Sequence, residues 1–264
     1  MVFKRLLASV GIGGPTIDTV LARPDVRPGE QVQGHIDLVG GETESHINGI
    51  HLELRTRAEV ETEDGERKAT VDTGAVGVSG PFVLAPGEQR RIPFAYPLSM
   101  QAPLTAAWGS PLPGSELGLR THVDIGGAID ATDLDPLLVH PLPAQQAVLD
   151  AVHTLGFTLV RSDVERGRIK GGRQELPFYQ EIEFRPRGAY AGKMKELEIS
   201  FLADAEGVHV VIEADKRGGL LTEGADRTGG FRIPHQGGDV GAKVKQQIDT
   251  LVQRRPGLMG DLFG

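Results

Sequence analysis

Apolar and polar residues alternate one by one along several stretches of the chain. In the clearest stretch, Ile50 to Val60, every second residue is apolar apart from Thr56, and the residues between are charged or histidine. Side chains on a β-strand point alternately to the two faces of a sheet. This stretch therefore predicts a strand with one face in a core and the other in water. Residues 31–38 and 117–125 show the same period.

Turn sequences separate these stretches and complete the pattern of the first half. Arg27 to Glu30 and Pro86-Gly87 combine proline with glycine, which favours tight turns. Pro93 and Pro97 make the segment 92–96 an edge strand or a bulged one, because proline lacks the backbone N–H. With a period of two from Thr16 and a weaker strand over 69–78, at least six strands are expected. This half therefore predicts an antiparallel β-sandwich.

The second half repeats the strand pattern and adds two helices. Strands are expected over 157–164, 178–185, 197–201 and 208–214, the last two as a hairpin. One helix is indicated by Val148, Leu149, Val152 and Leu155, with Gly156 at its end. The other begins at Asp239, a good N-cap, and ends before Pro256-Gly257. Its apolar stripe consists of Val240, Val244, Ile248, Leu251 and Val252. We expect a second sandwich with a helix at each end.

The first ten residues have a helical rather than an alternating pattern. Four apolar side chains, at Phe3, Leu6, Leu7 and Val10, follow the i, i+3, i+4, i+7 spacing of one helix face. So short a helix is unstable alone in water, and its apolar face must pack against something. That surface is either its own domain or a partner or membrane, toward which Lys4 and Arg5 would add charge.

A proline-rich segment divides the chain into two domains. Residues 135–143 contain three prolines, which favour an extended and stiff connector over a helix. Up to Pro143 the chain carries 11 Lys+Arg and 19 Asp+Glu, a net charge of −8, and the remainder carries 17 of each. We expect a first domain over 1–135, a hinge over 136–143, a second domain over 144–256 and a flexible tail over 257–264.

Composition narrows the class of protein. The 264 residues include no cysteine, which excludes disulfides and thiolate chemistry. The apolar run near the N-terminus stops at Gly11, too early for a signal peptide, and no run is long enough for a membrane span. A cytoplasmic location is expected. The acidic balance argues against binding nucleic acid.

No set of side chains assembles a catalytic or metal site in the sequence. His122 and Asp124 share a strand face that is expected to be solvated. The acidic segment from Asp130 to Asp135 lacks the glycine and glutamate of a calcium loop, and we expect a solvated loop. The segment from Gly188 to Met194 has the wrong spacing for a phosphate loop and is expected to be a turn. The basic residues between Arg161 and Arg173 are interleaved with acids and indicate a solvated face. We predict a protein that is not an enzyme and has no cofactor.

Several motifs resemble those of the bacterial SpoOM-type sporulation-control proteins. They are residues 1–13, 27–34, 86–94, 119–125 with 128–133, 176–184 and 233–235. The resemblance implies an all-β fold of two tandem arrestin-like β-sandwich domains, with short helices at the N-terminus, after the hinge and at the C-terminus. It also implies a cytoplasmic regulator that acts through protein partners in sporulation and cell division. It supplies no catalytic residues.

The functional prediction is a regulatory adaptor that binds proteins. The expected contact residues are Phe3, Leu6, Leu7 and Val10 of the N-terminal segment and Leu258, Met259, Leu262 and Phe263 of the tail. Two alternatives stay open: a peripheral membrane protein held by the N-terminal helix, and a β-sandwich protein that binds a small ligand. Homo-oligomerisation is also left open.

Overall fold

The computed structural model describes residues 8–9, 13–62, 65–169, 172–215, 227–236 and 238–253. The chain forms two compact units. Unit 1 comprises residues 1–106 and 116–140, and unit 2 comprises residues 107–115 and 141–264. A short stretch of the first half of the sequence therefore belongs to the second unit.

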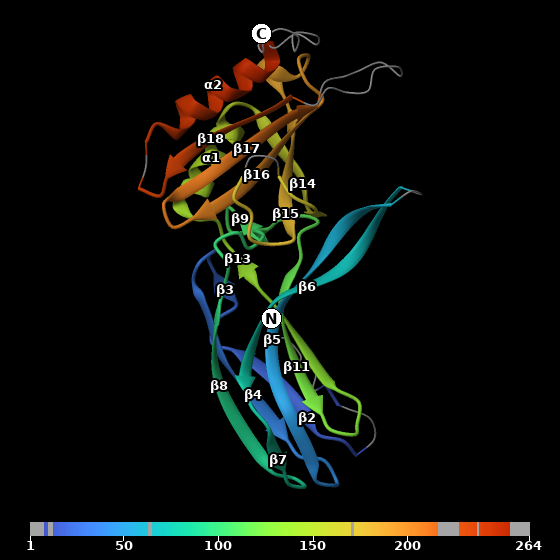
Figure 1. Ribbon diagram of the computed structural model, residues 1–264. Helices are drawn as coiled ribbons and strands as arrows, with labels where there is room; N and C mark the ends of the chain where they lie inside the picture. Colours follow the sequence, from blue (N-terminus) through green and yellow to red (C-terminus); the bar gives the residue numbers. More distant parts are fainter. Residues whose placement is uncertain are drawn as a thin grey trace, which may run out of the picture. The chain divides into compact units, whose positions relative to one another are not determined.

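Unit 1 contains two antiparallel sheets (Figure 1). One has the order β1-β2-β4-β8, and the other has the order β12-β11-β5, with β6 and β7 also paired to β5. The strands are β1 (Ala8–Ser9), β2 (Thr16–Leu21), β4 (Gln31–Val39), β5 (Ser45–Thr62), β6 (Gly65–Ser79), β7 (Phe82–Leu84), β8 (Gln89–Pro97), β11 (Leu117–Ile125) and β12 (Ala131–Pro136). Two short strands, β3 (Asp25–Val26) and β13 (Leu138–Val139), pair in parallel.

The core of unit 1 is built from the alternating apolar residues. Ile17, Ile36, Leu52, Leu54 and Leu119 are all buried. Facing sheets bury one side of each strand and leave the other to water, which explains the alternation in the sequence. The predicted sandwich and its strands are confirmed here. Strand β8 lies at the end of its sheet, as its prolines predict.

Unit 2 is organised around five antiparallel strands in sequence order. They are β14 (Phe157–Arg166), β15 (Phe178–Pro186), β16 (Glu196–Asp204), β17 (Gly207–Asp215) and β18 (Arg227–Pro234). The remaining elements are the small strands β9 (Ala106–Ala107) and β10 (Ser110–Pro111), which pair with each other, and the 3-10 turn η1 (Gly188–Tyr190).

Two helices form the second layer of unit 2. Helices α1 (Pro143–Thr154) and α2 (Val240–Gln253) contact each other and the sheet (Figure 1). They bury Val148 and Val152 of α1 and Val244 and Ile248 of α2. Both helices were predicted, and the Asp239 cap is confirmed by a 3.0 Å hydrogen bond from the Ala242 N–H. In the described part of unit 2, helices rather than a second sheet cover the apolar face of the five strands.

Three other expectations differ from the structure. Ala8–Ser9, within the predicted N-terminal helix, is a strand that pairs with the exposed edge of β2. The connector is extended, but it is also bound to unit 1, because Leu138 and Val139 pair with β3. The acidic segment expected as a loop is strand β12, which pairs with β11 from Ala131 to Pro136. In all three places, hydrogen bonds with the backbone of a neighbouring strand determined the structure, although the local sequence favoured another one.

The longest helix among the described residues is α2, with 14 residues. Among the described residues, no helix combines the length and apolar character that crossing a membrane requires.

Candidate functional site

The most unusual surface of the protein is the polar face of the sheet in unit 2, which we call the carboxylate face. It carries Asp163 and Glu165 of β14, Glu181 and Glu183 of β15, Glu196 and Glu198 of β16, and Glu213 of β17. The helices α1 and α2 cover the other face, where Ile182, Phe184, Ile199 and Ile212 are buried. Alternation along each strand therefore directs the acids away from the helices.

The strand register places carboxylates directly opposite one another. Asp163 faces Glu181 between β14 and β15, and Glu198 stands between Glu183 on β15 and Glu213 on β17. Cross-strand neighbours lie about 4.5–5.5 Å apart at Cβ, and like charges at that distance destabilise a sheet. A face of this kind needs cations, protons or positively charged side chains to balance it.

Arg161 supplies part of that balance. Its Nη2 lies 2.6 Å from Glu183 Oε1 and 3.2 Å from Asp163 Oδ2. Asp163 is only 3% exposed, so its charge is poorly solvated. Burial raises the pKa of Glu183, but hydrogen bonds with Arg161, Asp163 and Glu196 together outweigh burial and leave that pKa below its ordinary value. Arg161 therefore helps to keep Glu183 ionised at neutral pH.

Other carboxyl groups on this face hold protons more tightly. Burial raises the pKa of Glu181 to about 8, with further contributions from the charges of Glu198 and Glu165. Burial and the neighbouring Glu213 raise the pKa of Glu198 to about 7. Burial, together with a hydrogen bond to Glu183, also raises the pKa of Glu196. Part of the negative charge is thus removed by protons near neutral pH.

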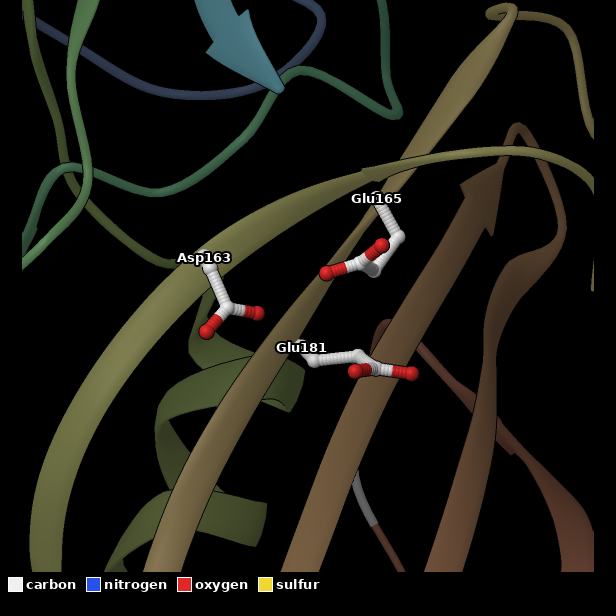
Figure 2. A group of neighbouring side chains, drawn as sticks. All are labelled: Asp163, Glu165 and Glu181. Carbon is white, nitrogen blue, oxygen red and sulfur yellow. The ribbon is translucent and has the colours of Figure 1, made fainter. Parts of the chain in front are cut away.

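Three of these side chains could hold one metal ion. Figure 2 shows the carboxyl groups of Asp163, Glu165 and Glu181 turned toward a common space. One oxygen from each lies within 4.8 Å of the others. Carboxylate oxygens are the ligands that Ca²⁺ and Mg²⁺ prefer. Arg161 already occupies one side of Asp163, so an ion would compete with the guanidinium.

The residues weighed for chemistry in the sequence are separated in the structure. His122 Nε2 lies 3.0 Å from Asp130 Oδ2, while Asp124 accepts a hydrogen bond from Asn48. His122 and Asp124 therefore bond to different residues rather than to each other. Gly188 begins a 3-10 turn, in agreement with the expected turn.

The aspartates in and just before β12 also have separate roles. Asp130 accepts hydrogen bonds from the Ile125 N–H and from His122, and Asp133 accepts one from the Thr19 N–H at 2.7 Å. Burial and the charge of Asp133 raise the pKa of Asp135 to about 7. Asp133 thus links β12 to β2, whereas Asp130 bonds to residues of β11, and these aspartates do not form a calcium loop.

All eight predicted contact residues lie outside the described part of the chain. They are Phe3, Leu6, Leu7, Val10, Leu258, Met259, Leu262 and Phe263. Sequence reasoning missed the carboxylate face, although the alternation of Glu181 and Glu183 with apolar residues was visible. The missing information was the register that brings the acids of four strands together.

The fold and this face define a mostly β, arrestin-like protein of two units that has no recognised catalytic arrangement among its described residues. The chain matches the sequence model of the family described as SpoOM protein over residues 3–218. It therefore belongs to the SpoOM family.

A sequence match and a structural match agree with this assignment. The chain is 36% identical over 216 residues to the sporulation-control protein spo0M of Bacillus subtilis (strain 168), which covers 81% of each protein. It also resembles the crystal structure of Spo0M, sporulation control protein, from Bacillus subtilis, with a TM-score of 0.72 and 29% identity. That match covers 92% of this chain and 96% of the other.

Proposed function

We propose that the protein is a non-enzymatic regulator of sporulation or cell division that acts in the cytoplasm by binding other proteins. The observation that carries this proposal is the 36% identity, over 216 residues, to a sporulation-control protein. A match of that length spans both units, so the similarity to that protein extends beyond a single domain. Two β-rich units offer broad surfaces for contacts with other proteins.

Two histidine–carboxylate pairs with exposed carboxylates favour a role without catalysis. His122 and His140 each lie beside one carboxylate, at 3.0 Å from Asp130 and 2.8 Å from Asp25. Both carboxylates are well exposed to solvent. General base catalysis needs such a pair to be aligned on a nucleophile or substrate in a sheltered site. Pairs of this kind at the surface are common structural features of proteins.

The contacts are proposed to be made by the apolar residues at the two ends of the chain. Phe3, Leu6, Leu7 and Val10 form one set, and Leu258, Met259, Leu262 and Phe263 form the other. Large apolar side chains provide most of the energy of protein interfaces when they enter a partner's pocket.

Crosslinking in living cells tests the proposal. The tagged full chain is expressed in its own organism, crosslinked during sporulation and analysed by mass spectrometry. We expect the capture of specific proteins, and we expect deletion of the gene to disturb sporulation or division. Unchanged development together with no specific crosslinks would overturn the proposal.

Two matched pairs of variants test the contact residues. The variant Leu262→Ser with Phe263→Ser should lose crosslinks that Asp261→Ala, in the same segment, retains. The variant Leu6→Ser with Leu7→Ser should behave in the same way relative to Lys4→Ala. Flotation of the chain with anionic liposomes, lost on replacing Leu6 and Leu7, would instead favour the peripheral membrane alternative.

A further inference from the structure

Unit 2 contains a groove between its two helices, which we call the helix groove. It has a volume of about 880 Å³ and lies between α1 and the first two turns of α2. Small and apolar residues form most of its surface, including Ala147, Ala151, Leu155, Gly241 and Ala242. Pockets that bind small ligands have volumes of about 300–1,000 Å³, so the space is large enough for several side chains.

The charged side chains beside the helix groove already have partners. Asp150 accepts hydrogen bonds from Trp108 Nε1 and from Gln146 Nε2, both at 2.7 Å. Lys245 forms an ion pair with Asp249. A polar ligand needs a few convergent polar groups to fix its orientation, and these groups are engaged elsewhere. The helix groove therefore suits an apolar occupant.

Trp108 marks one edge of the helix groove. Its indole is 43% exposed, and it bonds to Asp150, which lines the groove. It also has φ of +50°, the only positive value among the described residues other than glycine. Backbone strain of this kind persists where the surrounding structure enforces it, often at binding sites. Tryptophan is also the side chain most enriched at the centres of protein interfaces.

A second hollow connects this groove with the end of α2. It has a volume of about 390 Å³ and is lined by Asp249, Thr250 and Gln253 at one end. At its other end lie Ala242 and Lys245, which also line the helix groove. The two hollows therefore adjoin at Ala242 and Lys245, and the second extends along α2 to Gln253, its last described residue.

The chain itself provides an occupant of suitable composition and length. Residues 254–264 follow α2 directly and contain Leu258, Met259, Leu262 and Phe263. Lys245 lies eight residues before Gln253, or about 12 Å along the helix axis. An extended segment covers about 3.3 Å per residue, so residues 258–263 can reach the groove. Pro256-Gly257 favours the reversal of direction that this path requires.

We propose that the apolar residues between Leu258 and Phe263 bind in the helix groove of the same molecule. The two arginines that precede them, Arg254 and Arg255, would pass the acidic side chain of Asp249 on the way. A protein that recognises this segment must then compete with the groove for it. The binding itself does not depend on the regulatory role proposed above, because it occurs within one chain.

The composition of the chain allows a direct measurement. It has one tryptophan, Trp108, and no cysteine. A single cysteine introduced as Asp261→Cys can therefore be labelled specifically with a nitroxide, which quenches a nearby indole. We expect weaker Trp108 emission in the nitroxide-labelled full chain than after chemical reduction of the nitroxide. We also expect the quenching to be independent of protein concentration.

Paired variants then identify the groove as the binding surface. Ala147→Glu, which adds a charge to the apolar lining, should abolish the quenching. Lys243→Glu, on α2 outside the lining, should preserve it. If Ala147→Glu does not fold, Leu262→Ser with Phe263→Ser provides the same test from the other side of the contact, and it should also abolish the quenching.

Three results would overturn the proposal. They are the absence of quenching in the labelled full chain, equal quenching in all variants, and quenching that disappears on dilution. The last result would show that the segment binds a second copy of the chain. None of these measurements involves a partner protein, so they are independent of the crosslinking experiment.

Discussion

At the scale of single residues, the raised pKa values on the carboxylate face make the stability of unit 2 depend on pH. Glu181 faces Asp163 across two strands, and its pKa is raised to about 8 by burial and by the charges around it. An ordinary glutamate has a pKa of 4.5. The folded state therefore binds a proton over a pH range in which the unfolded state has released it.

This difference predicts a stability that falls as pH rises. The contribution of Glu181 to the free energy of unfolding is fully present below pH 4.5 and is lost as the pH rises through about 8. Glu198, with a pKa of about 7, acts in the same direction. We expect Glu181→Gln to raise the Tm at pH 8.5 by about 2–4 °C, or about 1 kcal/mol, and to change it little at pH 5.

Thermal melts from pH 5 to 8.5 in the presence of EDTA measure this effect. Glu206→Gln is the control, because Glu206 is 86% exposed in the same unit, and it should leave the Tm unchanged across the range. A lower Tm of Glu181→Gln at pH 8.5 would contradict the prediction, because it would show that the ionised Glu181 side chain stabilises the fold.

A buried pair of hydroxyl groups links two strands of unit 1. Thr19 Oγ1 and Thr121 Oγ1 lie 2.6 Å apart, and Thr121 is fully buried. Thr121→Val should lower the free energy of unfolding by about 1–3 kcal/mol, because it leaves the Thr19 hydroxyl without its partner. The double variant Thr19→Val with Thr121→Val should recover most of the loss. Urea unfolding of the parent, the two single variants and the double variant gives the coupling energy between the two hydroxyl groups. Losses that simply add in the double variant would contradict the prediction.

At the scale of elements, the alternation of side chains predicted most of the longer strands correctly, whereas two strands of six or more residues, β12 and β18, were missed. In β12 the polar Asp133 and Asp135 lie on the same side as core residues of β11, so no apolar alternation is visible. In β18, Gly229 replaces an apolar residue. A Cβ there would lie 3.0 Å from Gln247 Oε1 and 3.4 Å from Leu251 Cδ2 of α2, so the close approach of the helix leaves little room for a side chain.

Helix α2 depends on its N-terminal cap. The Asp239 carboxylate accepts a hydrogen bond from the Ala242 N–H and lies at the positive end of the helix dipole. Asp239→Ala should lower the free energy of unfolding by about 1 kcal/mol, while Asp239→Ser, which retains a capping oxygen, should stay close to the parent. Denaturant unfolding followed by circular dichroism measures both, and equal losses in the two variants would assign the effect to charge alone.

At the scale of the whole molecule, each unit has a hydrophobic core of its own. Leu54 is buried in unit 1, and Phe184 is buried between the sheet and helices of unit 2. Separate cores allow separate unfolding transitions. Leu54→Ala should lower one transition by about 2–5 kcal/mol, and Phe184→Ala should lower another by about 3–5 kcal/mol.

Differential scanning calorimetry distinguishes the two transitions. The control for each variant is the transition of the other unit, which should keep its temperature. A single transition that moves equally in both variants would show that the units unfold cooperatively, and the proposed domain boundaries would then have no energetic meaning.

The sequence by itself determined which residues face a core and which face water, because that property follows from the local period of the backbone. It also determined membership of the SpoOM family, since the motifs are contiguous in the chain. Only the tertiary structure decided that helices α1 and α2 cover the sheet of unit 2 and that the register brings Asp163, Glu181 and Glu198 close together. Register and layering depend on contacts between distant segments, and the period of one strand contains no information about its neighbour.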